Sequence, residues 1–104
     1  MKKAMLTISK TVENGKAFLF PEGRLDSVTA PEMEKALKEV LPEICELTLD
    51  FAKLEYISSA GLRVLLSAQK VMNARGKMTV TGVNETILEI FEVTGFSDIL
   101  KIEK

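Results

Sequence analysis

The chain is organised around the stretch Glu55-Tyr56-Ile57-Ser58-Ser59-Ala60-Gly61-Leu62-Arg63-Val64-Leu65-Leu66, in which a serine pair separates two apolar runs. Upstream, residues 47–51 alternate apolar and polar side chains, which predicts a strand with one buried face. From Leu62 onward the pattern is helical. Apolar side chains cover more than half of the helical wheel, so we expect a helix buried on most of its circumference: Val64, Leu65, Leu66, Ala68, Val71 and Met72.

Two hydroxyl groups therefore lie where a strand leads into a core helix. The start of a helix offers unpaired N–H groups and a partial positive charge, which suit an anion. The simplest interpretation makes Ser58 an N-cap whose hydroxyl accepts a hydrogen bond from a helix amide. One serine can also cap the helix while the other stays exposed, so both interpretations remain open here.

The composition bounds the class of protein. With 104 residues, 46% hydrophobic and 28% charged, we expect a single globular domain over residues 1–104. The net charge of -1, without a basic block, argues against a nucleic-acid partner. One cysteine, Cys45, makes no internal disulfide, and we interpret it as a small core residue or a bystander. No signal peptide or membrane span is recognisable, so we expect a cytoplasmic protein without membrane contact.

The chain alternates strand and helix patterns. Asn14-Gly15 is typical of a tight hairpin turn, while Thr29 and Glu32 have the spacing of a capping box. Asn84 is a candidate cap of the third helix, and Gly95 a candidate end. We predict strands at 5–12, 16–20, 46–51 and 77–81, and helices at about 31–41, 59–75 and 84–95. Residues 96–100 are predicted to form a short helical turn or a loop, and Ile102 a short edge strand.

Several details of burial and helix ends follow from the same patterns. The nearly continuous apolar character of residues 16–20 predicts burial on both faces, with Pro21 and Gly23 ending the strand. Gly76 suits a left-handed cap at the end of the central helix. The predicted elements form a hairpin followed by right-handed crossovers. This order predicts an α/β fold with a mixed sheet flanked by helices. We expect three loops to meet at the carboxyl ends of the parallel strands, at residues 23–29, 52–59 and 82–84.

The residue inventory excludes several kinds of chemistry. The chain has no histidine, so it has no Ser-His-Asp triad, and a single cysteine cannot make a zinc site. No glycine-rich phosphate loop occurs. We therefore expect no enzyme activity of its own, no metal and no cofactor. Asp26 is a candidate turn or helix-start acid stabilised by amides, and Asp50 a candidate strand-end polar residue.

The stretch 47–66 resembles the signature of bacterial anti-sigma factor antagonists, which have the STAS (sulfate transporter and anti-sigma factor antagonist) fold. Gly23-Arg24-Leu25-Asp26 and Val93-Thr94-Gly95-Phe96 extend the resemblance over nearly the whole chain. The resemblance implies a STAS-type mixed β-sheet of four to five strands flanked by about four helices. It also implies a regulator of sigma-factor-dependent transcription.

In that family the motif commonly reads Asp-Ser-Ser/Thr-Gly-Leu, and a partner kinase phosphorylates the serine after the Asp. Alignment on Gly61-Leu62 places Ser59 at the phosphoacceptor position, with Ser58 in place of the Asp and as the alternative acceptor. The partners implied are an anti-sigma factor serine kinase, which unmodified chains bind, and a serine phosphatase that resets them. The residues implied in partner binding are Asp26, Ser27, Ser58, Ser59, Ala60 and Arg63.

Two other hypotheses stay open at this point. Related STAS domains are reported to bind nucleotides, so a subunit that senses a nucleotide or another small ligand, with weak binding, is one. A two-component receiver with Asp50 as phosphoacceptor is the other. It is less favoured because no acidic pair follows the first strand and no Lys follows residues 80–81.

Overall fold

The computed structural model describes residues 6–103, which form six strands, three α-helices and two short 3₁₀ turns. The predicted order of strands and helices is confirmed apart from one additional strand at Leu54–Ile57, and the predicted first strand residue, Met5, lies outside the described residues. The strands are β1 (Leu6–Glu13), β2 (Lys16–Leu25), β3 (Glu46–Asp50), β4 (Leu54–Ile57), β5 (Lys77–Thr81) and β6 (Lys101–Glu103). The helices are α1 (Ala30–Val40), α2 (Ser59–Arg75) and α3 (Glu85–Thr94), with 3₁₀ turns at Leu41–Glu43 and Phe96–Asp98.

The strands form one mixed sheet in the order β1-β2-β3-β5-β6, and β4 pairs with the end of β2 beyond β3. The β1–β2 pair is antiparallel and every other pair is parallel. The hairpin turn between β1 and β2 is the predicted one, since Asn14 and Gly15 have φ angles of 53° and 78°. The predicted α/β fold class is confirmed, with one strand more and one helix fewer than expected.

The additional strand, β4, lies inside the segment predicted as a loop at residues 52–59. Four residues are too few to show a periodicity of their own, and β4 exists because β2 continues past its predicted end at Phe20. Pro21 does not stop β2. The β3 pairing ends at Leu19 and the β4 pairing begins at Gly23, so Pro21 lies in the gap between the two partners, where no ladder on that side requires its N–H.

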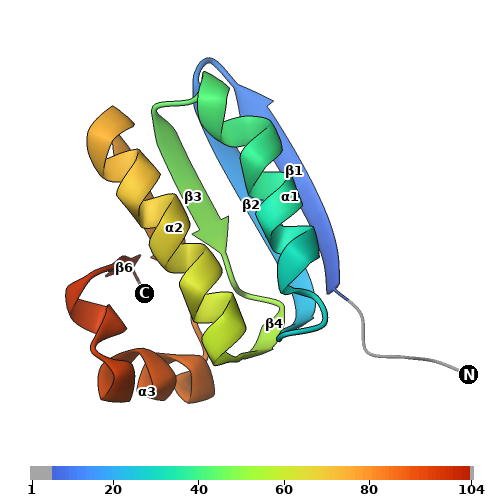
Figure 1. The fold of residues 1–104 in the computed structure, drawn as a ribbon, viewed down its shortest axis with the longest axis vertical. Coiled ribbons are helices and arrows are strands. Elements are labelled where there is room, and N and C mark those ends of the chain that lie inside the picture. Colours follow the sequence, from blue (N-terminus) through green and yellow to red (C-terminus); the bar gives the residue numbers. More distant parts are fainter. Residues whose placement is uncertain (1–5, 104) are drawn as a thin grey trace, which may run out of the picture.

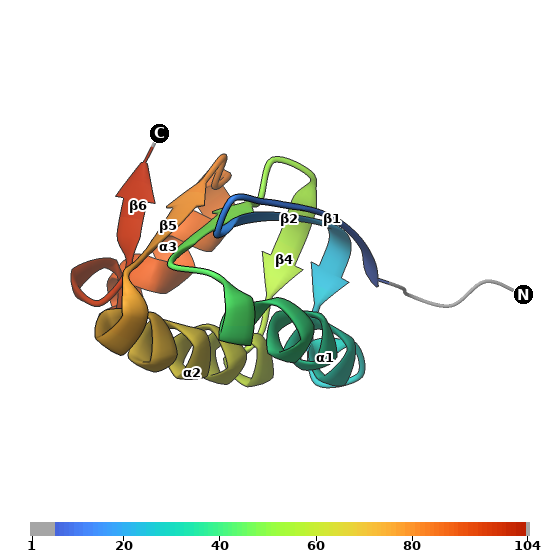
Figure 2. The same ribbon diagram turned by 90° about the horizontal axis from the view of Figure 1, so that it is seen from above.

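Helices α1 and α2 lie side by side across one face of the sheet (Figures 1 and 2), which we call the helix face. The opposite face of β2 and β3, the open face, carries Phe18 and Phe20, which remain 40% and 39% exposed. The predicted burial of β2 on both faces is therefore wrong. Leu19, which points to the helix face, is fully buried. Strand β2 therefore follows the alternation of a sheet that is covered on one side.

The buried side of α2 is narrower than predicted. Its buried residues include Leu65 and Met72 on the apolar side but also the polar Gln69, whereas Val71 is 39% exposed. A helix that rests on one face of a sheet, with α1 on one flank, buries one side and leaves the other in solvent. In the described part of the chain, no helix is long and apolar enough to cross a membrane.

Two of the predicted structural roles of single residues change. Gly76 ends α2 in an extended conformation, with φ 173°, and not in the predicted left-handed one. A glycine is required there because a Cβ atom would collide with the backbone carbonyl of Cys45. Cys45 itself is exposed, so of its two predicted roles the core role is wrong. Gly95 ends α3 as predicted, in a left-handed conformation with φ 83°.

Candidate functional site

The serine turn joins the end of β4 to the start of α2. The N–H of Ser58 donates to the carbonyl of Leu25 at 2.9 Å, and the carbonyl of Ser58 accepts the first helical bond from Leu62 at 2.9 Å. A Cβ atom on Gly61 would lie 2.7 Å from both Ile57 Cγ1 and Leu25 Cγ. The first turn of α2 is thus seated directly on the ends of β2 and β4, which leaves the serine pair at the carboxyl edge of the sheet.

The two serines have different environments. Ser58 is the N-cap residue in backbone geometry, with φ -102° and ψ 179°, but its side chain makes no capping bond. Its Oγ is buried and has no hydrogen-bond partner among the described residues. The predicted hydrogen bond of the cap is therefore wrong, because the backbone supplies the position while the hydroxyl is directed elsewhere. Ser59, the first residue of α2, is exposed, so its hydroxyl is the accessible one of the pair.

The loop after β2 is held by the Asp26 carboxylate. Asp26 Oδ1 accepts from the N–H groups of Val28 at 3.0 Å and Thr29 at 3.1 Å, and Arg24 Nε lies 3.9 Å from its other oxygen. The hydrogen bond from the Thr29 N–H is the main cause that holds the pKa of Asp26 below its ordinary value, with the Val28 N–H acting in the same direction and burial opposing both. The interpretation of Asp26 as a turn acid is confirmed.

The predicted capping box at the start of α1 does not form. The hydroxyl of Thr29 donates to the carbonyl of Arg24 at 2.8 Å and accepts from the N–H of Asp26 at 2.9 Å. Glu32 reaches Thr29 through the backbone alone, its N–H donating to the Thr29 carbonyl at 2.9 Å. The threonine is buried and closes the loop after β2, so its hydroxyl is not available to the helix.

The loop after β2 and the start of α2 meet over a groove between α1 and α2. The groove has a volume of about 350 Å³. It brings together three of the predicted partner-binding residues, of which Ser27 and Arg63 are exposed and Ala60 is half-buried. Its lining consists of Ser27, Ala30, Pro31, Glu34, Ala60, Arg63, Val64 and Ser67.

Sequence reasoning missed a residue beside this groove, Val28. Its side chain is 75% exposed on the turn that Asp26 holds in place. Because Val28 follows Ser27, a predicted partner-binding residue, its side chain adds an apolar group to that edge of the molecule. The signal was present in the sequence, since a valine stands inside a polar turn, but its exposure depends on how the turn folds.

The third predicted loop does not join the serine turn. Asn84 caps α3 as predicted, its Oδ1 accepting from Ile87 N at 2.8 Å, while its Nδ2 donates to the carbonyl of Leu54 at 3.1 Å. Leu54 is the first residue of β4, so this loop meets the beginning of the strand whose far end carries Ser58. The extra strand β4 separates the two regions.

A model of the STAS domain family matches residues 7–104. The chain belongs to the STAS domain family. Among curated relatives, the anti-sigma-B factor antagonist of Listeria monocytogenes is 32% identical over 87 residues, which cover 82% of this chain and 76% of the relative. The resemblance inferred from the serine motif is confirmed at the level of the family.

Solved structures agree on the fold. An anti-sigma factor antagonist from Mycobacterium paratuberculosis superposes with a TM-score of 0.85 at 21% identity, covering 93% of this STAS domain chain and 84% of that protein. SpoIIAA, an anti-sigma factor antagonist, superposes in its unphosphorylated form with a TM-score of 0.73 at 14% identity, covering 95% and 87%. At such identities the likeness concerns the backbone fold.

Proposed function

We propose that this STAS domain protein is an anti-sigma factor antagonist, controlled by phosphorylation of Ser59. Unmodified, it binds an anti-sigma factor that is a serine kinase and so releases a sigma factor. The kinase inactivates it by phosphorylating Ser59, and a separate serine phosphatase restores it. The whole chain acts as one STAS domain in the cytoplasm, where its transcriptional partners work.

The observation that carries this proposal is the difference between the two serines. Ser59 is exposed at the first position of α2, whereas the hydroxyl of Ser58 is buried. A kinase must align a free hydroxyl with the γ-phosphate of ATP, which a buried oxygen does not permit. Membership of a family whose relatives are named anti-sigma factor antagonists supports the same interpretation. Ser59 is thus the favoured acceptor, and Ser58 the alternative.

The proposed partner surface is the edge formed by the Asp26 turn, the serine pair and the groove between α1 and α2. Its members are Asp26, Ser27, Ser58, Ser59, Ala60 and Arg63. The hydrogen bonds of the Asp26 turn hold the loop in shape before any partner binds, which lowers the entropic cost of association. Ser58 contributes backbone in this arrangement, because its hydroxyl faces inward.

The proposed switch is local repulsion at this surface. A phosphoserine adds about -1.5 to -2 charges at pH 7. At the first turn of α2, with Arg63 one helical turn further on, such charge is mildly favourable by about 0.3–1 kcal/mol, so the fold stays intact. Buried in an interface without a partner, the same charge costs about 2–5 kcal/mol, which is some tens- to thousands-fold in affinity.

The first test maps the modification. The chain is incubated with its kinase and ATP, and the phosphorylated position is read by fragmentation mass spectrometry. We expect phosphate on Ser59, and phosphate mainly on Ser58 would overturn the assignment. The same sample tests the receiver hypothesis, because an acyl phosphate on Asp50 is acid-labile and a phosphoserine is not.

The second test separates binding from folding. Ser59→Asp should bind the anti-sigma kinase weakly while its circular dichroism and melting temperature match those of the wild type. Ser59→Ala should bind well and resist inactivation by the kinase. Equal affinities of the two variants would count against local repulsion, and a broad change of backbone chemical shifts on phosphorylation would indicate a conformational switch in its place.

A further inference from the structure

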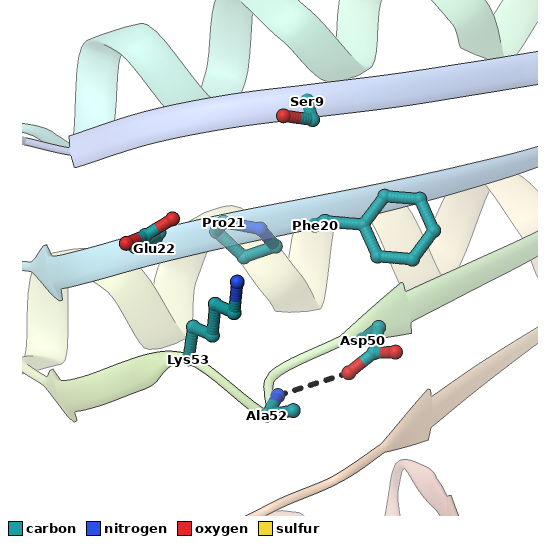
Figure 3. Close-up of a pocket in the computed structure, with 7 residues that line it drawn as sticks. All are labelled: Ser9, Phe20, Pro21, Glu22, Asp50, Ala52 and Lys53. Carbon is teal, nitrogen blue, oxygen red and sulfur yellow. Dashed lines mark hydrogen bonds between the residues drawn. The ribbon is translucent and has the colours of Figure 1, made fainter.

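The open face of the sheet contains a hollow of about 300 Å³ that is separate from the groove beside the serines (Figure 3). It forms where the sheet is interrupted. Strand β3 ends at Asp50 and β4 begins at Leu54, so the connecting residues leave a gap beside β2. The hollow is lined by Ser9, Phe20, Pro21, Glu22, Asp50, Ala52 and Lys53.

The hollow is lined by side chains of opposite charge that form no ion pairs with one another. Glu22, Asp50 and Lys53 border the same hollow, yet none of them forms an ion pair among residues 6–103. Asp50 is oriented by the N–H of Ala52, which donates to its Oδ1 at 2.9 Å, and its Oδ2 accepts no protein hydrogen bond in the described chain. Exposed charges in such proximity that stay unpaired can each bind a complementary group of a ligand.

The arrangement of these groups suggests the shape of a ligand. Figure 3 shows Lys53 and Asp50 on either side of Ala52, with Pro21 facing the space between them and Glu22 at the Lys53 end. The half-exposed ring of Phe20 offers an apolar wall next to Asp50. One end of the site therefore carries the Lys53 ammonium and the Glu22 carboxylate, the middle is apolar, and the other end carries the Asp50 carboxylate.

We propose that this hollow binds a basic amino acid. The α-ammonium and α-carboxylate groups pair with Glu22 and Lys53, the alkyl chain lies beside Phe20 and the exposed Ala52, and the side-chain ammonium pairs with Asp50. Two carboxylates and one ammonium make the hollow negative by one charge, and a basic amino acid is positive by one, so the complex is neutral. The volume is at the lower end of the range for ligand sites, which suits a molecule of this size.

Nuclear magnetic resonance tests the proposal with L-lysine as the probe. The ¹⁵N-labelled chain is titrated at constant ionic strength to about 50 mM, a range that covers the millimolar affinity expected of a small ligand on an open surface. We expect saturable shifts at the amides of residues 20, 22 and 50–53. Two analogues test the charges: L-norleucine lacks the side-chain ammonium and cadaverine lacks the carboxylate. Each should bind about two- to fivefold more weakly.

Matched variants test the residues. Asp50→Asn keeps the acceptor for the Ala52 N–H but removes the charge, and Lys53→Gln removes the ammonium; each should weaken L-lysine binding about two- to fivefold. Glu46→Gln and Lys16→Gln, at the opposite ends of β3 and β2, should leave it unchanged. Absence of saturable shifts, equal binding of an analogue, or unchanged binding by Asp50→Asn would overturn the proposal.

Discussion

Helices α3 and α2 differ in their N-caps. The capping side chain of α3 forms hydrogen bonds, and we call this a closed cap; the capping side chain of α2 forms none within residues 6–103, and we call this an open one. At the start of α3, the Asn84 side chain accepts from Ile87 N and also donates to Leu54 O. At the start of α2, Ser58 has the backbone geometry of a cap, but its hydroxyl makes no bond among the described residues. A side-chain cap contributes about 0.5–2 kcal/mol, so α2 forgoes stability that α3 has. The forgone cap leaves the N–H groups beside Ser59 available for a phosphate.

Because α2 lacks a side-chain cap, its stability depends on the packing of its buried side. A substitution on that side should therefore have the largest effect on the free energy of unfolding. Leu65→Ala should lower the free energy of unfolding by about 2–5 kcal/mol, because Leu65 is fully buried and a cavity remains. Urea denaturation measures the loss. The matched control is Val71→Ala on the same helix, which is 39% exposed and should cost far less. Similar losses for both variants would show that the burial of α2 is not one-sided.

The closed cap of α3 gives the next effect. Asn84→Ala should lower the free energy of unfolding by about 1–3 kcal/mol, because the cap is lost and the Leu54 carbonyl loses its donor. Asn84→Asp is the control that keeps the capping acceptor and removes the donor, so it should lose less. Hydrogen exchange of the first amides of α3 should speed up in Asn84→Ala. Wild-type stability of that variant would remove the contrast between the two helix starts.

The open start of α2 gives a smaller effect of opposite sign. Ser58→Ala should leave the free energy of unfolding unchanged or raise it by up to about 1 kcal/mol, because the hydroxyl is buried without a hydrogen bond. Ser67→Ala, at an exposed position of α2, is the control for removing a serine hydroxyl that is open to water. A decrease of about 1 kcal/mol in the free energy of unfolding, measured by thermal or urea denaturation, would mean that the Ser58 hydroxyl caps α2.

The smallest effect concerns the turn that lies beside this open start. The pKa of Asp26 is lowered in the folded chain, chiefly by the hydrogen bond from the Thr29 N–H. The stabilisation from the ionised carboxylate is therefore fully present above the unfolded pKa of about 3.9 and is lost as the pH falls through the lower, folded value. Asp26→Asn keeps an acceptor oxygen but not the charge.

Unfolding curves at several pH values test this sign. The stability difference between the wild type and Asp26→Asn should be constant near neutral pH and should shrink below about pH 4. Glu32→Gln, an exposed change in the first turn of α1, is the control and should show no comparable convergence. A difference that grows on acidification would contradict the assigned role of Asp26.

Much of the candidate site could be read from the chain because its determinants are local. The placement of Ser59 at the first turn of the central helix followed from the change of apolar period at Leu62 and was found in the structure. The Asn14-Gly15 turn, the Asn84 cap and the end of α3 at Gly95 were predicted for the same reason. Each depends on a residue and its immediate neighbours, whose conformational preferences the sequence states directly.

Contacts between distant segments decided the rest. Strand β4 exists because the end of β2 offers it a partner, and β2 tolerates Pro21 because the sheet is interrupted beside it. Whether β2 is covered on one face or two depends on where α1 and α2 pack. The sequence by itself determined the order of elements and the position of Ser59. The tertiary structure decided which serine hydroxyl is buried, which loops meet and which sheet face stays open, because these depend on burial by residues far away in the chain.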